Sequence, residues 1–508
     1  MLNAHSGDRL RSEDAVFLYL ETPEAPLHIG SISIFDGKIP FQQCMEYIES
    51  RLPLIPRYRQ RIVVPPFHFG HPTWEADPEF DIHNHVREVV LKRGTESELR
   101  AFAGRHFSRI MDRNRPLWDM TVVDGLEGGR SALISRVHHC LVDGVSGVGL
   151  MNVMLDPSLR PRKPQSRNGR PAPLPGALTS LADALSTGIS DMMERFLSAQ
   201  STALDLAHAL VSDRAQRGFD QLVRLVPELM TPVDRLPFNR ACSGARKVAW
   251  TEIAMAEVKS IRESCGGTLN DVMLTVLTAA VRRYALLHRV GVKGKRLRLM
   301  VPVNVRREGM ENGLGNRVSM LPVSVPLDVT DPVELLELIR ARTEALKSAH
   351  VADLIYLIAT WMGMTPVPLQ AAVGPLSSLL PVPPFNMVCT NVPGPQAPLY
   401  ALGHKMVTYH PYVPIANQMG LGCAIQSYNG TLFIGLSADA ESAPDVERLR
   451  QFLDEAFRAL CRAAGVTPAS VKRRRVRRQV VSREAGASAP ETKPPAFEPA
   501  RVLAAAGD

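Results

Sequence analysis

The stretch SALISRVHHCLVDGVSG, residues 131–147, decides how we expect this chain to be organised. Its first seven residues alternate and end in apolar and β-branched side chains, which predicts a strand. His138 and His139 follow directly, where the strand stops and a cavity can begin. Imidazole accepts a proton near neutral pH and returns it, so the pair predicts acid–base chemistry at this point.

The residues after the histidines predict a loop and then a helix. Ser146 is a suitable N-cap for the apolar run at 148–154. Asp143 can hold the loop by hydrogen bonds or by pairing with an arginine, and Gly144 lets the chain turn where a Cβ would clash.

Composition places the chain among ordinary globular proteins. Its 508 residues suggest two or three domains, and 45% hydrophobic with 22% charged residues is typical of that class. The seven cysteines form no CxxC pair, which favours reduced thiols in a cytoplasmic protein over a disulfide framework or a zinc site. The first fourteen residues contain no apolar run of the signal-peptide kind, so we do not expect secretion.

The net charge of +8 is modest, and part of it lies in the basic run KRRRVRR at 472–478. We favour a solvated, disordered tail there. A patch that rests on anionic lipid is the sharper alternative, at roughly 1 kcal/mol per cation. Nucleic acid is disfavoured because no interleaved aromatic residues accompany the run.

Between Leu354 and Ala438 the only charged residue is Lys405. Six prolines interrupt the most apolar part, so this stretch does not predict a transmembrane helix. Two readings stay open and are compatible: a buried central sheet with its loops, and an apolar channel with a surface that dips into a membrane or lipid droplet.

Periodicity and turn signals predict the remaining elements. We expect helices at 10–21, 40–52, 96–108, 256–265, 270–288, 332–349 and 445–464. We expect strands at 27–35, 57–64, 86–91, 120–124, 248–253, 297–303, 320–325, 387–390, 421–427 and 431–438. In the first helix Ser12 is the expected cap, with Val16, Phe17 and Leu20 on one face.

Three local signals are more specific. Thr268 followed by Asp271 predicts a capping box. Tyr428-Asn429-Gly430 predicts a hairpin. The last helix is amphipathic, with its apolar residues on one side.

HHCLVDG at 138–144 resembles the HHxxxDG signature of the large CoA-dependent acyltransferase superfamily, which includes chloramphenicol acetyltransferases and peptide-synthetase condensation domains. Four further motifs are similar to one branch, the bacterial wax ester synthase/diacylglycerol acyltransferases. These are RPLW at 115–118, LNDVML at 269–274, GNRVSMLPV at 315–323 and TNVPGP at 390–395. The resemblance runs from SxxDxxFLYLE at 12–21 to about residue 465 and leaves the tail outside.

The resemblance implies an α/β (α+β) fold of two chloramphenicol-acetyltransferase-like domains with the active-site tunnel at their interface. We expect an N-terminal acyltransferase domain at 1–155 and a linker with connecting helices at 156–245. A C-terminal acyltransferase-like domain at 246–470 and a basic, disordered tail at 471–508 complete the chain.

The resemblance also implies roles for residues. His139 matches the general base of the family, and His138 matches a supporting histidine. Asp143 matches an acid that holds the loop through an arginine of the second domain, for which Arg317 is a candidate.

Substrate-binding or supporting roles are expected for Gly144, Asn270, Pro116, Leu117 and Trp118. For Trp118 a buried core position is favoured, and a role at the substrate mouth stays open. Asn270 either caps its helix together with Asp271 or presents its amide to the substrate.

The implied activity is transfer of a long acyl chain from acyl-CoA to diacylglycerol, a fatty alcohol or both, which yields triacylglycerol or wax ester and free CoA. Acyl-CoA is then a co-substrate, and neither a cofactor nor a metal is expected. We expect a cytoplasmic protein, with a peripheral membrane or lipid-droplet surface as its partner, and no nucleic acid.

Two other functions stay open. A condensation-type acyltransferase would take a carrier-bound thioester, and a catalytically silent lipid-binding protein would need no base. A metal site is disfavoured because the histidine pair lacks a third ligand nearby. A Ser-His-Asp hydrolase is disfavoured because the sequence contains no GxSxG motif.

Overall fold

The computed structural model describes residues 9–65, 70–141, 144–159, 231–304, 318–349 and 384–467, with 351, 355, 367 and 370 as single residues. Several predictions lie outside this part of the chain. They are Asp143, Arg317, most of the linker and all the helices expected between 160 and 230, the charge-poor residues 371–383, and the basic run at 472–478.

The helices are α1 (Ser12–Leu20), α2 (Phe41–Arg51), α3 (Glu96–Phe107), α4 (Gly144–Met154), α7 (Met255–Cys265), α8 (Leu269–Leu287), α9 (Pro332–Ser348) and α12 (Val446–Ala463). The first strands are β1 (His28–Phe35), β2 (Gln60–Val63), β3 (Thr73–Ala76), β4 (Val86–Val90), β5 (Trp118–Leu126) and β6 (Arg130–His138). The later ones are β7 (Arg246–Ala254), β8 (Arg296–Asn304), β9 (Val318–Pro326), β10 (Met387–Val392), β11 (Tyr400–Ala401), β12 (His404–Tyr412), β13 (Leu421–Tyr428) and β14 (Thr431–Asp439).

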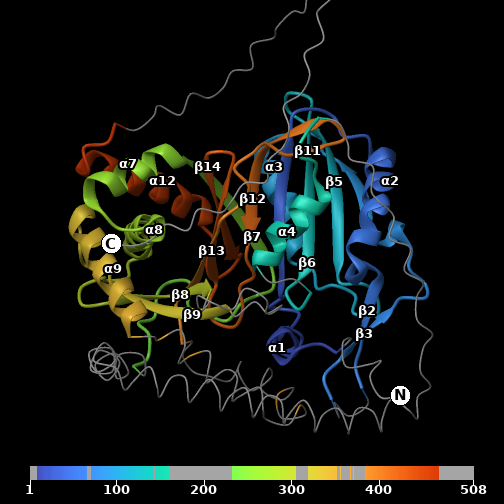
Figure 1. The fold of residues 1–508 in the computed structure, drawn as a ribbon. Helices are drawn as coiled ribbons and strands as arrows, with labels where there is room; N and C mark the ends of the chain where they lie inside the picture. Colours follow the sequence, from blue (N-terminus) through green and yellow to red (C-terminus); the bar gives the residue numbers. More distant parts are fainter. Residues whose placement is uncertain are drawn as a thin grey trace, which may run out of the picture. The chain divides into compact units, whose positions relative to one another are not determined.

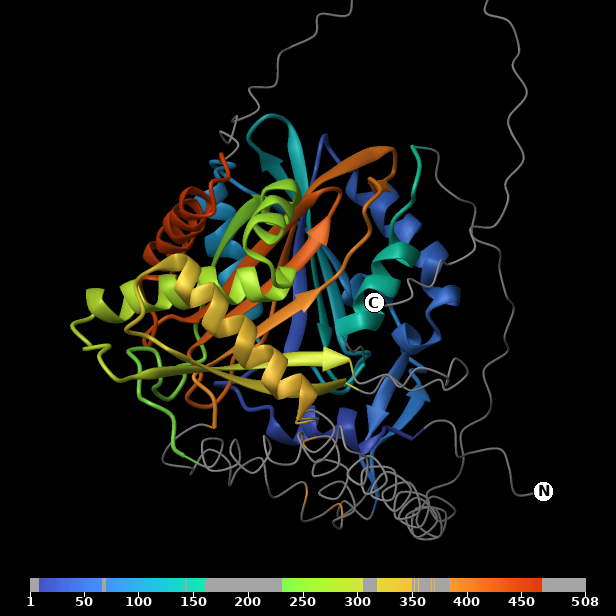
Figure 2. The same cartoon turned by 60° about the vertical axis from the view of Figure 1, so that its left-hand side comes forward.

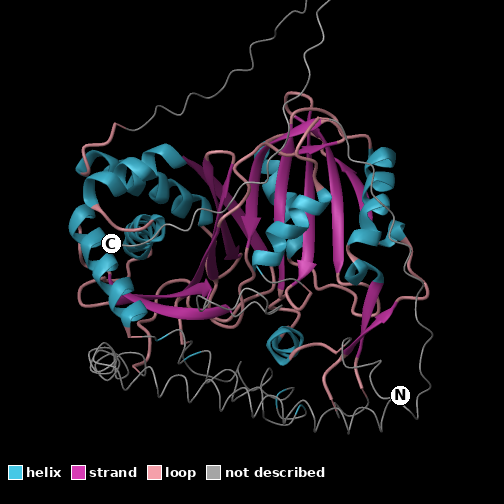
Figure 3. Cartoon of the chain, in the orientation of Figure 1, coloured by secondary structure: helices cyan, strands magenta, loops and turns pink. Residues whose placement is uncertain are grey.

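Two six-stranded sheets organise these elements (Figures 1 and 3). The N-terminal sheet has the order β11-β12-β1-β6-β5-β4, and β6 pairs with antiparallel neighbours on both sides. The C-terminal sheet has the order β7-β14-β13-β10-β8-β9, and β10 runs parallel to both of its neighbours. This mixed architecture confirms the predicted fold class of two sheet-containing α/β units.

Helices bury the apolar faces of both sheets. In Figure 2, α8, α9 and α12 lie together beside the C-terminal sheet, and their apolar residues share one core with it. In the N-terminal half, α2 and α4 bury side chains against one face of the sheet and α3 buries Leu99, Ala103 and Phe107 against the other. The same α3 cluster includes Val248 and Trp250 of β7, so α3 lies where the two halves meet.

Two strands from the second half of the sequence belong to the N-terminal sheet. β12 pairs antiparallel with β1, and β11 pairs with β12 at the sheet edge. Neither strand is among those predicted from the sequence. β12 therefore ties residues 404–412 to the sheet that carries the histidine pair.

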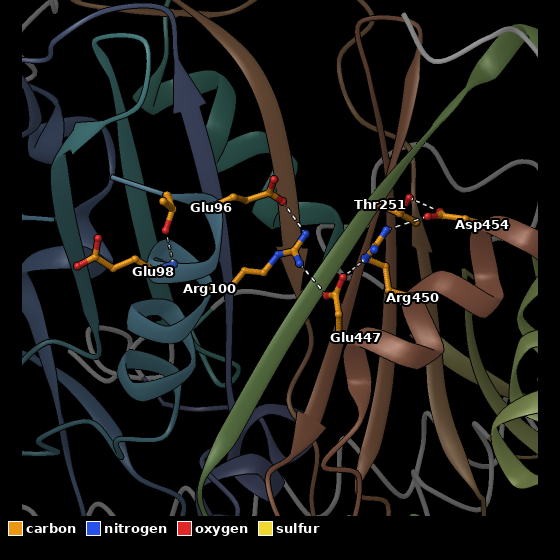
Figure 4. A network of polar contacts seen from close by, with 8 residues as sticks. Glu96, Glu98, Arg100, Thr251, Glu447, Arg450 and Asp454 are labelled. Carbon is orange, nitrogen blue, oxygen red and sulfur yellow. Dashed lines mark hydrogen bonds and ion pairs between the residues drawn. The ribbon is translucent and has the colours of Figure 1, made fainter. Parts of the chain in front are cut away.

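A polar network joins α3 to the C-terminal half (Figure 4). Arg100 of α3 donates to the Glu447 carboxylate of α12 at 2.7 Å. Arg450 donates to Glu447 at 2.6 Å and to Asp454 at 2.8 Å. Thr251 of β7 donates to Asp454 as well, so one chain of contacts links α3, α12 and β7.

Local signals that rest on turn and cap chemistry are confirmed. Thr268 and Asp271 form a reciprocal capping box at the start of α8. Asn429 and Gly430 have positive φ values of 46° and 78° in the hairpin between β13 and β14. The apolar residues of α12 are buried as predicted: Val446, Leu449, Leu453, Phe457 and Leu460.

One detail of α1 was predicted wrongly: the N-cap is Arg11 rather than Ser12. The buried residues of the helix are Ser12, Ala15 and Leu18, and Val16 is 37% exposed. α1 packs through Ala15 and Leu18 on a separate apolar cluster, which turns Phe17 toward the end of β6.

The first residues of two other elements differ from the prediction. α4 begins at Gly144, so Ser146 lies inside the helix rather than at its cap. Within the expected strand 57–64, Pro56–Arg59 forms a 3₁₀ turn and only Gln60–Val63 pairs as a strand. Pro56, which is fixed at a helical φ, favours that turn.

Within the part of the chain that the structure describes, none of the helices combines the length and the apolar character needed to cross a bilayer.

Candidate active site

The two histidines lie at the end of β6, the strand between β1 and β5. His138 is the last residue of the strand and is fully buried. His139 follows in a turn and is half-buried, and its backbone N–H donates to the Leu27 carbonyl at 3.0 Å. The predicted position of the pair, where a strand stops, is therefore confirmed.

The His138 ring has a defined partner at each nitrogen. The backbone N–H of Cys140 donates to Nδ1 at 3.2 Å, which requires a lone pair on that atom. Nε2 lies 3.3 Å from Oε1 of Glu21. The Cys140 N–H and the Glu21 carboxylate therefore lie against the two ring nitrogens of His138. His138 is thus a poor candidate for the base.

Glu21, the residue after α1, holds several groups through one carboxylate. Oε1 also accepts from the Leu27 N–H at 2.9 Å, and Oε2 accepts from Nη2 of Arg113 at 3.0 Å. Burial raises the pKa of Glu21, but its bonds to His138, Leu27 and Arg113 outweigh that effect and the net shift is downward. The buried carboxylate is therefore charged at neutral pH.

His139 has different surroundings. Its ring stacks on Phe17 of α1, with 3.8 Å between ring centroids and 9° between planes. Unlike His138 it is not fully enclosed. A half-buried imidazole whose ring is held by stacking can take a proton from a hydroxyl group brought within hydrogen-bond distance.

The RPLW motif supports the pair from β5. The Leu117 carbonyl accepts the His138 N–H at 2.9 Å. Trp118 is only 2% exposed, donates from Nε1 to the Tyr58 carbonyl at 2.8 Å, and stacks between Tyr58 and His85 at 4.6 Å from each. Pro116 and Leu117 are buried too. The motif lies in the core, so its observed contacts are those of a structural support.

The other predicted site residues are distributed as follows. Gly144 is the first residue of α4, while Asp143 before it lies outside the described residues. Asn270 lies half-buried in the first turn of α8, and the capping bonds there are made by Thr268 and Asp271 instead. The role of Asn270 in binding stays a prediction.

The contribution of α1 and of the residue that follows it was not predicted from the sequence. Phe17 and Glu21 contact His139 and His138, and Leu27 binds both Glu21 and His139 through its backbone. A signal was available, because Glu21 ends an apolar run and follows Phe17 by four residues, the spacing of one helical turn.

Two paired sheets with a histidine pair at a strand end define a two-domain, chloramphenicol-acetyltransferase-like acyltransferase. The model of the wax ester synthase/diacylglycerol acyltransferase catalytic domain matches residues 10–273, and the model of the WS/DGAT C-terminal domain matches residues 314–461. The chain belongs to the wax ester synthase/diacylglycerol acyltransferase family.

Individual relatives align with this chain over nearly its whole length. The Mycobacterium tuberculosis protein named "Probable diacylglycerol O-acyltransferase tgs1" is 27% identical over 487 residues, which cover 93% of this chain and 98% of that one. The solved wax ester synthase/diacylglycerol acyltransferase from Marinobacter aquaeolei VT8 has a TM-score of 0.62 at 24% identity, covering 90% of this chain and 100% of that chain. The first condensation domain of the CDA synthetase shares the fold with a TM-score of 0.56 at 14% identity, covering 92% and 98%.

Proposed function

We propose that this acyltransferase moves a long acyl chain from acyl-CoA to the hydroxyl group of diacylglycerol or a fatty alcohol, with His139 as general base. The names of its relatives, diacylglycerol O-acyltransferase and wax ester synthase, supply the two acceptor classes. The products are triacylglycerol or wax ester and free CoA.

The asymmetry of the histidine pair is the observation that carries the assignment. His138 is enclosed, with Cys140 at Nδ1 and Glu21 at Nε2. His139 is half-buried beyond the strand end, and Phe17 stacks on its ring. We therefore assign a structural role to His138 and proton transfer to His139.

The reaction balances with one base. His139 takes the acceptor O–H proton as the oxygen attacks the thioester carbonyl carbon, and the new C–O bond gives a tetrahedral intermediate. That intermediate collapses by breaking the C–S bond. The proton held by His139 then goes to the departing CoA sulfur, so neither an acyl-enzyme nor an external reductant or oxidant is needed. A positioned base contributes roughly 10²- to 10⁴-fold, and alignment of two bound substrates supplies much of the rest.

Apolar acceptors accumulate in membranes and lipid droplets, so we propose that the enzyme works at such a surface on the cytoplasmic side. The basic run at 472–478 supports this proposal by its charge alone. The predicted loop-holding role of Asp143 and the tunnel between the two halves belong to the same proposal.

The test is thiol release from palmitoyl-CoA, followed with hexadecanol, with dioleoylglycerol, and with neither. We expect release only with an acceptor, and a loss of at least about 100-fold in His139→Ala, the lower bound for removal of a general base. His83→Ala serves as a matched control because the His83 side chain is 68% exposed and pairs only with Asp81 beside it.

Other outcomes would overturn the proposal. Retained binding of lipid without thiol release for any acceptor would indicate a silent lipid-binding protein. Turnover of a carrier-bound thioester but not of acyl-CoA would indicate a condensation-type enzyme. Full activity in a folded His139→Ala variant would remove His139 as the base.

A further inference from the structure

Two residues a helical turn apart, one in α1 and one directly after it, each contact one histidine of the candidate site. Phe17 stacks on the His139 ring, and the Glu21 carboxylate lies against Nε2 of His138. Figure 1 shows α1 near the end of β6 from which the histidines emerge. The mechanism proposed above uses neither residue.

Glu21 occupies an unusual position for a carboxylate. Its side chain and that of His138 are both 0% exposed. A buried charge persists only where it is paired and hydrogen-bonded. Glu21 meets that condition with two donors, the Leu27 N–H and the Arg113 guanidinium, and Nε2 of His138 lies 3.3 Å from its Oε1.

Two of these contacts lead to His139. The first is the contact with the side chain of His138, the residue that precedes His139. The second passes through the Leu27 peptide: its N–H donates to Glu21, and its C=O accepts the His139 N–H at 3.0 Å. One carboxylate therefore constrains the backbone of His139 both from the preceding residue and from the adjacent β1 end.

Arg113 completes the arrangement from outside. Its Nη2 donates to Oε2 of Glu21 and to the Leu18 carbonyl of α1 at 2.8 Å. The Arg113 side chain is 43% exposed, whereas the Glu21 side chain is 0% exposed. The carboxylate is thereby fixed in direction as well as in charge.

We propose that Glu21 is a positioning residue for acyl transfer: it holds the His138 ring and the backbone of His139, and so sets the direction of the catalytic imidazole. The inference deepens the proposed function and depends on His139 being the base. A reacting group displaced by about 1 Å can lose roughly 100-fold in rate. Loss of the carboxylate is therefore expected to lower turnover rather than substrate binding.

The test compares Glu21→Gln with Glu98→Gln in the acceptor-dependent thiol-release assay. Glu98 is the matched control because its carboxylate also accepts from backbone N–H groups, those of Lys92, Arg93 and Gly94, but at the start of α3. We expect Glu21→Gln to lower kcat roughly 10- to 100-fold, with KM for palmitoyl-CoA and for the acceptor within about threefold of wild type. Glu98→Gln should keep the kcat of the wild type.

If Glu21→Gln does not fold, Glu21→Asp carries the test. Aspartate keeps a charge for Arg113 but withdraws its oxygens from His138, so kcat should fall while the melting temperature stays close to that of the Glu98→Gln control. Wild-type kcat in either folded variant, or a rise in KM with kcat unchanged, would overturn the role of Glu21.

Failure of the two proposals can be distinguished. If wild-type protein shows no acceptor-dependent release, the proposed function fails. If His139→Ala is inactive and Glu21→Gln turns over like wild type, only the positioning role fails.

Discussion

At the residue scale, the molecule separates two identical side chains by their surroundings. β6 ends at His138, and His139 lies in the turn that follows, so the two adjacent histidines have different environments. His138 is enclosed beside Glu21, and the His139 ring stacks on Phe17.

Phe17 is the direct neighbour of the proposed base and gives a prediction at this scale. A stacked aromatic pair contributes about 0.5–1.5 kcal/mol beyond burial. Phe17→Leu keeps an apolar side chain but loses the stack, so we expect kcat to fall roughly 2- to 12-fold, the rate equivalent of that energy. The measurement is kcat with saturating palmitoyl-CoA and hexadecanol.

Val16→Ala is the control for the same helix. Val16 is 37% exposed and precedes Phe17 in α1. A similar loss in both variants would mean that α1 is merely destabilised, and wild-type kcat in Phe17→Leu would show that the stack has no effect on turnover.

At the element scale, the close approach of β12 and β14 depends on a glycine. A Cβ built on Gly435 of β14 would overlap the Pro411 carbonyl of β12. Both partners at the clash are backbone, which cannot rotate aside. The N-terminal and C-terminal sheets can come together here only because position 435 has no side chain.

We expect Gly435→Ala to lower the free energy of unfolding by about 1–3 kcal/mol, the usual cost of overpacking. The measurement is the urea midpoint. Gly291→Ala is the matched control, since nothing lies within 4 Å of its added Cβ. The same substitution there shows the effect of alanine on the unfolded chain alone, which is stabilising by up to about 1 kcal/mol. Equal midpoints for the two variants would contradict the steric argument.

The elements that the sequence predicted are those specified by neighbouring residues. The Thr268–Asp271 capping box and the Asn429-Gly430 hairpin need only local chemistry, and both are confirmed. The position of the histidine pair at a strand end is of the same kind.

What could not be predicted depends on residues far apart in the chain. β12 pairs with β1, and its sequence HKMVTYHPY does not indicate which sheet it joins. Glu21 contacts His138 because β1 and β6 are neighbours and α1 packs beside them.

At the scale of the whole molecule, the two halves are joined by polar and aromatic contacts as well as by strand exchange. The network from Arg100 to Asp454 links α3 with α12 and β7 (Figure 4). Beside it, His410 of β12 stacks on Trp250 of β7 at 4.6 Å and meets Phe433 of β14 edge-on at 5.6 Å. An ionisable side chain thus lies inside the contact between the sheets.

His410 makes the stability of the protein dependent on pH. Burial, with a further contribution from the Arg100 charge, lowers the pKa of His410 from 6.5 to about 3. At pH values between these two pKa values, His410 is protonated in the unfolded chain but neutral in the folded chain. Stability from this group is therefore complete above about pH 6.5 and is lost as the pH falls. Burial also lowers the pKa of His28, His85 and His106 in the N-terminal half, which adds to the same trend.

His410→Phe isolates the contribution of this one group. Phenylalanine preserves the ring between Trp250 and Phe433 and cannot titrate. From pH 7 to pH 5 the wild type should lose about 2 kcal/mol more unfolding free energy than the variant, as the linkage relation gives for one histidine that stays neutral. Chemical denaturation at the two pH values measures the difference. Carboxyl groups with lowered pKa, among them Glu21 and Asp119, act at lower pH because their ordinary pKa values are 4.5 for Glu and 3.8 for Asp. His83→Gln, at a side chain that is 68% exposed, shows whether loss of any histidine has the same effect. If both variants change the pH dependence equally, the buried histidine between the sheets is not its cause.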